Sequence, residues 1–272
     1  MWLNEEQITD PAIRAYRKTL KQAIPNYLVI DQLFDNGKLQ QVCRVLQQNQ
    51  HWQTQQHTYD ALYVKNATWQ KTPAEQRFVQ RDLWQRPVPD AASATAINAA
   101  VQVTNNVIGN PGSVSASSPE NTALAFLHFL RGAEFMALLS RIFRVQITDI
   151  SVANPALNTN YFRLGPRDFV NQHADDSPGR EVCMLLYLNE GWQEQQGGEL
   201  VFSGKDDTHV SITPLFNRCV LFDPSSPGSE HWVNAVNAVN AGNNEGTDTD
   251  NAEHANNAQH YRYNLTSWYW SE

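Results

Sequence analysis

Two histidines and one aspartate in the second half of the chain could bind a metal ion together. His173 and Asp175 stand two positions apart, and His231 follows 56 residues later (231 − 175). Two imidazoles and one carboxylate form the facial triad of non-haem Fe(II) sites, which leaves coordination positions open for a co-substrate and oxygen. Pairs such as His173 and Asp175 arise often by chance, but His231 strengthens the signal. The three residues are therefore a candidate metal site.

Strand geometry could bring these ligands together. Residues i and i+2 of a strand face the same side, so His173 and Asp175 could point at one ion while the small Ala174 faces away. His231 follows a β-rich segment and a Gly/Pro turn. We expect it to enter the site from the opposite side of a barrel.

An arginine near the C-terminus could hold an anionic ligand. Arg262 lies in HYRYNLTSWYW, where aromatic and polar residues alternate. A guanidinium that points inward from such a strand needs a partner, and its planar fork can bind a carboxylate at two points. An exposed strand arginine is the ordinary alternative. Two histidines compete with His231 as third ligand: His254 lies in an Asn/Ala-rich tract, and His260 would bring Arg262 close to the metal.

The composition of the 272 residues is that of a soluble globular protein, with 41% apolar and 18% charged residues. The net charge of −8 argues against nucleic-acid binding, which depends on Lys and Arg contacts to phosphates. The chain has no apolar run long enough for a bilayer and no apolar N-terminal signal, so we expect no membrane partner. Cys43, Cys183 and Cys219 are widely separated, which indicates buried thiols in a reducing compartment, and we expect the cytoplasm.

Residues 1–150 are expected to form a helical and mixed scaffold that includes the first strand. Turn-forming residues, capping residues and apolar spacing separate its elements. In chain order, we expect a helix from Asp10-Pro11, a strand in NYLVIDQLF, a helix over Gly37–Gln48, strands and loops over 51–89 that could cover a cleft, a loop over 91–122, and helices from Ser118-Pro119-Glu120 onward.

Residues 151–272 change to short β-rich segments between Gly, Pro, Asp, Asn and Ser. Eight such segments favour a jelly roll or double-stranded β-helix, mainly β with supporting N-terminal helices and a single compact domain. Residues 233–260 interrupt the pattern: eight of the 28 are Asn and six are Ala. That composition cannot build a packed core, so we expect a surface insertion between two strands, near the active-site mouth.

Several strings of the second half are more selective than the metal-ligand pattern. They are NYFRLGPRDFVNQHAD, VCMLLYLNEGWQEQQGGELVF, ITPLFNRCVLFD, HWV and RYNLTSWYW. In this order they resemble the prolyl hydroxylase branch, the prolyl 4-hydroxylase-like enzymes, of the Fe(II)/2-oxoglutarate-dependent oxygenase superfamily. The resemblance covers about the last 110 residues well and the N-terminal half loosely. The 31 residues between His231 and Arg262 (262 − 231) exceed the short turn of these relatives.

The resemblance implies a role for each matching residue. His173, Asp175 and His231 would hold Fe(II), and Arg262 would pair with the C5 carboxylate of 2-oxoglutarate. Tyr187 would donate a hydrogen bond to this co-substrate. Tyr161 would line the same pocket, although core packing is a serious alternative for either tyrosine. On the face of Arg262, Thr266 and Trp268 would lie near the iron and co-substrate.

The implied activity is an O2-consuming hydroxylation of a C–H bond, most simply of a prolyl residue in a protein or peptide, with ascorbate as a further cofactor. Two other functions stay open. A cupin-like metal-binding or sensor module would keep the metal without turnover, and an oxygenase of this type could act on a free amino acid or another small molecule. An alkylated nucleobase fits the acidic charge least. The substrate and the oligomeric state do not follow from the sequence.

Overall fold

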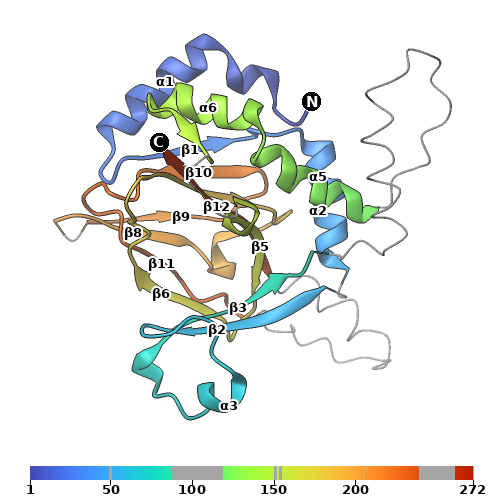
Figure 1. The fold of residues 1–272 in the computed structure, drawn as a ribbon, viewed down its shortest axis with the longest axis vertical. Coiled ribbons are helices and arrows are strands. Elements are labelled where there is room, and N and C mark those ends of the chain that lie inside the picture. Colours follow the sequence, from blue (N-terminus) through green and yellow to red (C-terminus); the bar gives the residue numbers. More distant parts are fainter. Residues whose placement is uncertain are drawn as a thin grey trace.

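The fold is built on one curled sheet that helices cover on one side (Figure 1). The computed structural model describes residues 1–48, 51–86, 119–149, 152, 155–206, 208–238 and 261–271. Within this part of the chain the strands are β1 (Tyr27–Asp31), β2 (Trp52–Thr58), β3 (Arg77–Trp84), β4 (Ile147–Thr148), β5 (Thr159–Leu164), β6 (Phe169–His173), β7 (Arg180–Tyr187), β8 (Leu200–Lys205), β9 (Thr208–Ile212), β10 (Arg218–Phe222), β11 (His231–Val233) and β12 (Arg262–Ser271).

The predicted β half is confirmed: each of its eight segments forms one strand, from β5 to β12. The order across the sheet is β1-β10-β7-β12-β5-β3-β6-β11-β8-β9, with β2 paired to β3 and β4 to β12. Strands far apart in sequence are therefore neighbours, as in a double-stranded β-helix. The mainly β class with supporting helices agrees with the sequence-based prediction.

Four helices cover the outer face of the sheet, close to where helices were predicted: α1 (Asp10–Gln22), α2 (Asn36–Gln47), α5 (Pro119–Leu130) and α6 (Ala133–Phe143). A further short helix, α3 (Asn66–Trp69), lies apart from them in the connection between β2 and β3. Thr9 is the N-cap of α1, since its side chain accepts the backbone N–H of Ala12. Short 3-10 turns cover Glu5–Ile8, Ala74–Gln76, Pro155–Asn158 and Glu194–Gln196.

Two apolar clusters divide the sheet into an outer and an inner face. The outer one packs Phe126 and Leu139 of the helices against Met184 and Leu265 of the strands. The inner one contains Tyr187 and Phe202. Among the described residues no single helix could span a membrane; the two segments Thr122–Leu130 and Ala133–Phe143 pass by length and composition only as a pair bent by 43°.

The first part of the chain also contributes strands to the sheet. β1 pairs with β10, β3 with β5 and β6, and β4 with β12. The division at residue 150 stays a prediction from the sequence. Residues 51–89 form the β2–β3 hairpin with a connection that carries α3, and residues 87–89 lie outside the described chain.

Two predicted irregular segments lie largely outside the described residues. These are most of the loop over 91–122 and most of the insertion over 233–260. The insertion begins later than expected, since Val233 ends β11 and the buried Val236 forms a bridge with Gly197.

Candidate functional site

Neighbouring strands bring the three candidate metal ligands together. His173 ends β6 and His231 begins β11, and these two residues face each other in the antiparallel pairing of the two strands. His231 therefore comes from the adjacent strand and not, as the sequence suggests, from the opposite side of the barrel. Asp175 lies two residues beyond the end of β6, and its carboxylate faces the two histidines.

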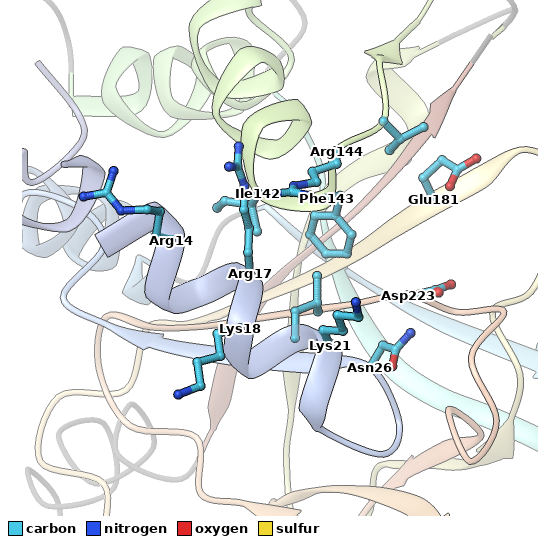
Figure 2. A pocket seen from close by; sticks show the side chains of 12 residues that line it. Arg14, Arg17, Lys18, Lys21, Asn26, Ile142, Phe143, Arg144, Glu181 and Asp223 are labelled. Atoms are coloured by element: carbon cyan, nitrogen blue, oxygen red, sulfur yellow. The ribbon is translucent and has the colours of Figure 1, made fainter. Parts of the chain in front are cut away.

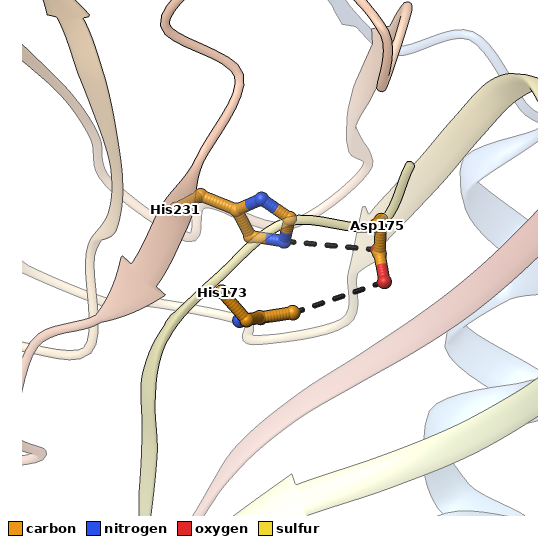
Figure 3. A group of neighbouring side chains, drawn as sticks. All are labelled: His173, Asp175 and His231. Carbon is orange, nitrogen blue, oxygen red and sulfur yellow. Dashed lines mark ion pairs between the residues drawn. The ribbon is translucent and has the colours of Figure 1, made fainter. Parts of the chain in front are cut away.

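Backbone hydrogen bonds fix the two imidazole rings. Nδ1 of His173 lies 2.9 Å from the carbonyl oxygen of Asn171, and Nδ1 of His231 lies 2.9 Å from that of Ser229. A carbonyl accepts only from a protonated Nδ1, so each Nε2 keeps a lone pair. Each Nε2 lies 3.8 Å from one carboxylate oxygen of Asp175 (Figure 3).

Electrostatics favours the deprotonated forms of His231 and Asp175. Burial and the nearby His173 lower the pKa of His231 to about 4. Burial opposes ionisation of Asp175, but the histidines and the nearby donors outweigh it and hold its pKa below the ordinary value. Neutral imidazoles and an ionised carboxylate are the states that bind a cation.

These three residues fit a divalent metal ion. Their donor atoms all lie within 4.8 Å of one another. A separation of 3.8 Å between Nε2 and a carboxylate oxygen is less than twice a bond of roughly 2.1 Å to a first-row metal, so one ion can reach both atoms. The N2O donor set with positions left open suits Fe(II).

Two neighbouring side chains hold the Asp175 carboxylate in place. Trp268 Nε1 donates to its Oδ2 at 2.9 Å, and Arg180 Nη1 lies 3.7 Å from its Oδ1 and donates to its backbone oxygen. Trp268 lines the cavity, as the resemblance implies, but the contact that it makes is with a metal ligand. Such partners orient a ligand and tune its basicity.

Arg262 lies in the same cavity and is almost fully buried, with 1% of its surface exposed. Nε donates to the carbonyl of Gly198 at 2.7 Å, and Nη1 donates to Oδ1 of Asn264 at 2.7 Å. Asn264 in turn donates to Oγ1 of Thr266 at 3.0 Å. The three side chains share one face of β12, and Thr266 lies in the cavity as expected.

One donor of Arg262 and the hydroxyl of Tyr187 are left without partners. Arg262 Nη2 and Tyr187 Oη are both buried and make no hydrogen bond. The Arg262 guanidinium lies over the Tyr187 ring, 4.9 Å from its centre. Burial raises the pKa of Tyr187 to about 12, so its hydroxyl stays protonated and can donate. Buried unpaired donors are costly, and together these two suit an incoming carboxylate.

Tyr161 does not belong to this site, and that prediction is wrong. Its hydroxyl donates to the carbonyl of Ala123 at 3.0 Å, and its ring packs edge-on against Trp84 in the outer core. The reason is strand alternation. Tyr161 pairs with Leu265, whereas Arg262 and Asn264 pair with Leu164 and Phe162 on the opposite face.

The triad and Arg262 line a cavity of about 740 Å³. Its wall includes apolar residues of the inner face, such as Leu185 and Leu200, and polar residues of the β2–β3 hairpin. Tyr59, Leu62 and Tyr63 lie in the connection of this hairpin and are exposed at the cavity. The expectation that residues 51–89 cover a cleft is thus supported for the hairpin.

A second cavity, of about 520 Å³, lies between α1 and the end of α6 (Figure 2). Its lining is basic, with Arg14, Lys18 and Lys21 exposed along α1. It contains no cluster of three metal-binding side chains among the described residues and no buried unpaired polar atom. Solvated surface charge accounts for it, and the triad cavity is the functional candidate.

The sequence-based prediction missed several residues of the triad cavity. Asn264 could have been found from its place between Arg262 and Thr266 on one strand face. Arg81 and Arg180 carry no local signal, because only the fold brings β3 and the start of β7 to the cavity. The alternative ligands His254 and His260 lie outside the described residues.

Comparisons with known proteins agree with this site. Residues 159–270 match the 2OG-Fe(II) oxygenase superfamily, where 2OG is 2-oxoglutarate. No curated protein matches the sequence. A prolyl-4-hydroxylase structure from Pseudomonas putida is 15% identical with a TM-score of 0.50, and 96% of this chain and 99% of that chain are covered. A 2OG-Fe(II) oxygenase family oxidoreductase from Burkholderia pseudomallei is 13% identical with a TM-score of 0.54, over 96% and 92%.

At such identities the similarity to these two structures shows the fold alone. The family match shows in addition that the segment with the candidate site residues resembles the superfamily in sequence. The matched segment contains the metal-ligand triad and Arg262, on the strands that the double-stranded β-helix brings together. Residues 159–270 of this chain therefore form a domain of the 2OG-Fe(II) oxygenase superfamily.

Proposed function

We propose that this protein is a 2-oxoglutarate-dependent dioxygenase that hydroxylates a prolyl residue of a protein or peptide and releases succinate and CO2. One observation carries the proposal: a single cavity holds both a triad that suits Fe(II) and a buried guanidinium with an unpaired donor. A metal-binding sensor module would have no use for Arg262 and Tyr187 in this arrangement. Together they provide the site that a dicarboxylate co-substrate needs.

Each residue of the site has a defined task. His173, Asp175 and His231 would hold Fe(II), which when bound supplies the redox chemistry that couples decarboxylation of 2-oxoglutarate to insertion of one oxygen atom of O2 into a C–H bond. Arg262 Nη2 and Tyr187 Oη bind the distal carboxylate of 2-oxoglutarate and so orient it. Trp268 and Arg180 keep the Asp175 carboxylate directed at the metal position.

Two observations support the prolyl substrate. The fold is similar to that of a prolyl-4-hydroxylase, and the exposed Tyr59, Leu62 and Tyr63 give the cavity an apolar rim on which a peptide could lie. Ascorbate as a reductant belongs to the same proposal. The three free, buried cysteines support the cytoplasm as the location.

The test combines binding with turnover. Under anaerobic conditions the protein should bind Fe(II) and then 2-oxoglutarate, and addition of oxygen should produce succinate even without substrate. His173→Ala and Asp175→Ala should both reduce succinate formation to background. Full turnover in either variant would exclude the assigned metal site. Mass spectrometry of proline-containing peptides for a gain of 16 Da then tests the prolyl substrate.

A further inference from the structure

The charges that line the triad cavity do not balance. Among its described lining residues there are three arginines, Arg81, Arg180 and Arg262, and one acidic residue, Asp175. Arg180 contacts Asp175, and Arg262 is assigned to the co-substrate carboxylate. The metal, Asp175, Arg180, Arg262 and the dianion 2-oxoglutarate together carry a net positive charge, so they leave no negative charge for Arg81. Arg81 is therefore a cation with no assigned counter-charge.

Arg81 is held in the cavity wall without a polar partner. Its guanidinium carbon lies 3.5 Å from the centre of the Phe162 ring, so the ring fixes the plane of the fork. Nε is out of contact with solvent and makes no hydrogen bond, and no carboxylate of the described chain forms an ion pair with Arg81. Burial lowers its pKa to about 10, although Asp175 and Tyr63 act in the opposite direction. Arg81 as a whole is partly exposed, but its buried, unpaired Nε favours an anion beside it.

Two polar residues beside Arg81 complete a binding site. Gln55 pairs with Arg81 across the β2–β3 hairpin, and His57 follows on the same face of β2. Both are buried and line the cavity, and His57 Nε2 has no hydrogen-bond partner. Burial lowers the pKa of His57 to about 4, and the imidazole is therefore neutral and able to donate through one nitrogen.

This group of donors lies two strands from Arg262 in the same sheet, with β5 between β3 and β12, and Arg262 is near enough to help lower the pKa of Arg81. β3 runs between β5 and β6, next to the strand that carries His173, whereas Arg262 lies on β12 between β5 and β7. An anion at Arg81 would thus be separate from the distal carboxylate of the co-substrate. It would also lie in the cavity that contains the metal ligands.

We propose that Arg81, with His57 and Gln55, binds a carboxylate of the substrate that is hydroxylated. Within the proposed function, the enzyme then selects a prolyl residue with a carboxylate close to the reacting C–H bond, at the C-terminus of a peptide or beside Asp or Glu. A free amino acid would fit the same group of donors and would replace the protein or peptide as substrate. This inference rests on the proposed oxygenase function and names the substrate class of the same cavity. Arg81 determines specificity and takes no part in metal binding.

Blocking of carboxylates tests the proposal on a mixture of candidate substrates. A cell extract is separated into small molecules and peptides, and half of each fraction is treated with carbodiimide and methylamine, which convert carboxylates into neutral amides. After removal of the reagents, all fractions receive enzyme, Fe(II), 2-oxoglutarate and oxygen. Products that are 16 Da heavier should form in an untreated fraction and be lost from its blocked half. The fraction that contains them distinguishes a free acid from a peptide.

Variants of Arg81 connect this result to the residue. Arg81→Gln should raise about 10- to 100-fold the amount of untreated fraction that gives half-maximal hydroxylation, as expected for loss of a charge-assisted hydrogen bond. Arg81→Lys should bring this amount part of the way back to the wild-type value. The 2-oxoglutarate affinity of Arg81→Gln, measured by anaerobic calorimetry, should stay within about twofold of the wild type. Arg14→Gln, in the exposed second cavity, is the matched control and should behave as the wild type.

Two results would overturn the inference while leaving the oxygenase assignment intact. One is equal hydroxylation of the blocked and untreated extracts. The other is loss of 2-oxoglutarate affinity in Arg81→Gln, which would place Arg81 in the co-substrate site. Absence of both 2-oxoglutarate binding and succinate formation in the wild type would instead contradict the proposed function itself.

Discussion

Both imidazoles of the triad are oriented by the backbone that precedes them. In each case Nδ1 bonds to the backbone oxygen two residues earlier, at Asn171 for His173 and at Ser229 for His231. These local bonds do not depend on the metal, so the ligand geometry exists before metal binds. Arg262 is prepared in the same way, since Gly198 and Asn264 hold two of its nitrogens and leave the third free.

The free donors of Arg262 and Tyr187 predict a graded loss of 2-oxoglutarate affinity. Arg262→Ala should raise the dissociation constant by about 100-fold, and Tyr187→Phe by about tenfold, because the first removes a charged donor and the second a neutral one. Anaerobic calorimetry measures both. Tyr161→Phe is the control: its hydroxyl bonds to Ala123 in the core, so stability should fall while the affinity is unchanged. If Tyr161→Phe lost as much 2-oxoglutarate affinity as Tyr187→Phe, Tyr161 would belong to the co-substrate site after all.

His57 predicts a pH dependence of stability. Its pKa is lowered from 6.5 to about 4 by burial, and the nearby Arg81 adds to this. Below pH 6.5 His57 binds a proton in the unfolded chain, whereas in the folded protein it stays neutral down to about pH 4. Acidification through this window therefore lowers the free energy of unfolding, by at most about 1.4 kcal/mol per pH unit. His57→Gln should therefore lose less stability than the wild type between pH 7 and pH 5. Denaturant unfolding of the metal-free proteins measures this, and identical losses would contradict a neutral His57.

At the scale of elements, the sequence predicts strands whose residues alternate, but it does not predict features that depend on which strands pair. Alternation in RYNLTSWYW predicts β12 and the shared face of Arg262 and Thr266. The wrong position of Tyr161 has a physical reason, since its face depends on pairing with Leu265, which no local pattern shows. The packing of the β2–β3 hairpin that brings Arg81 to the cavity likewise depends on contacts distant in sequence.

Gly198, in the turn that leads into β8, predicts that a substitution outside the cavity wall weakens 2-oxoglutarate binding. A Cβ on Gly198 would lie 2.9 Å from Cδ of Arg262, whereas a Cβ on Gly191 would meet nothing within 4 Å. Both glycines have positive φ, +73° and +70°, so either alanine costs about 1–2 kcal/mol of backbone strain. Only Gly198→Ala should also displace the guanidinium and weaken 2-oxoglutarate binding severalfold. Thermal unfolding and calorimetry of the two variants separate these effects, and equal affinities would show that Arg262 adapts freely.

For the whole molecule, the site depends on strands that are remote in sequence. β6 and β11 provide the metal ligands and β12 provides Arg262, and the described strands join one sheet. Ligands that bind the folded state alone must stabilise that state, because unfolding separates their contacts. The proposed site therefore makes a prediction about the stability of the entire chain.

Under anaerobic conditions Fe(II) and then 2-oxoglutarate, each at about 100 times its dissociation constant, should each stabilise the fold by about 2.7 kcal/mol, and each step raises Tm by roughly 5–10 °C for a chain of this size. A chelator should reverse the shift. Asp175→Ala should show no shift with Fe(II), because two imidazoles without the carboxylate hold the ion weakly. Arg262→Ala should keep the increase in Tm that Fe(II) causes and lose the increase that 2-oxoglutarate causes. If Asp175→Ala shifted like the wild type, the metal would bind elsewhere, so the two variants locate each ligand independently of turnover.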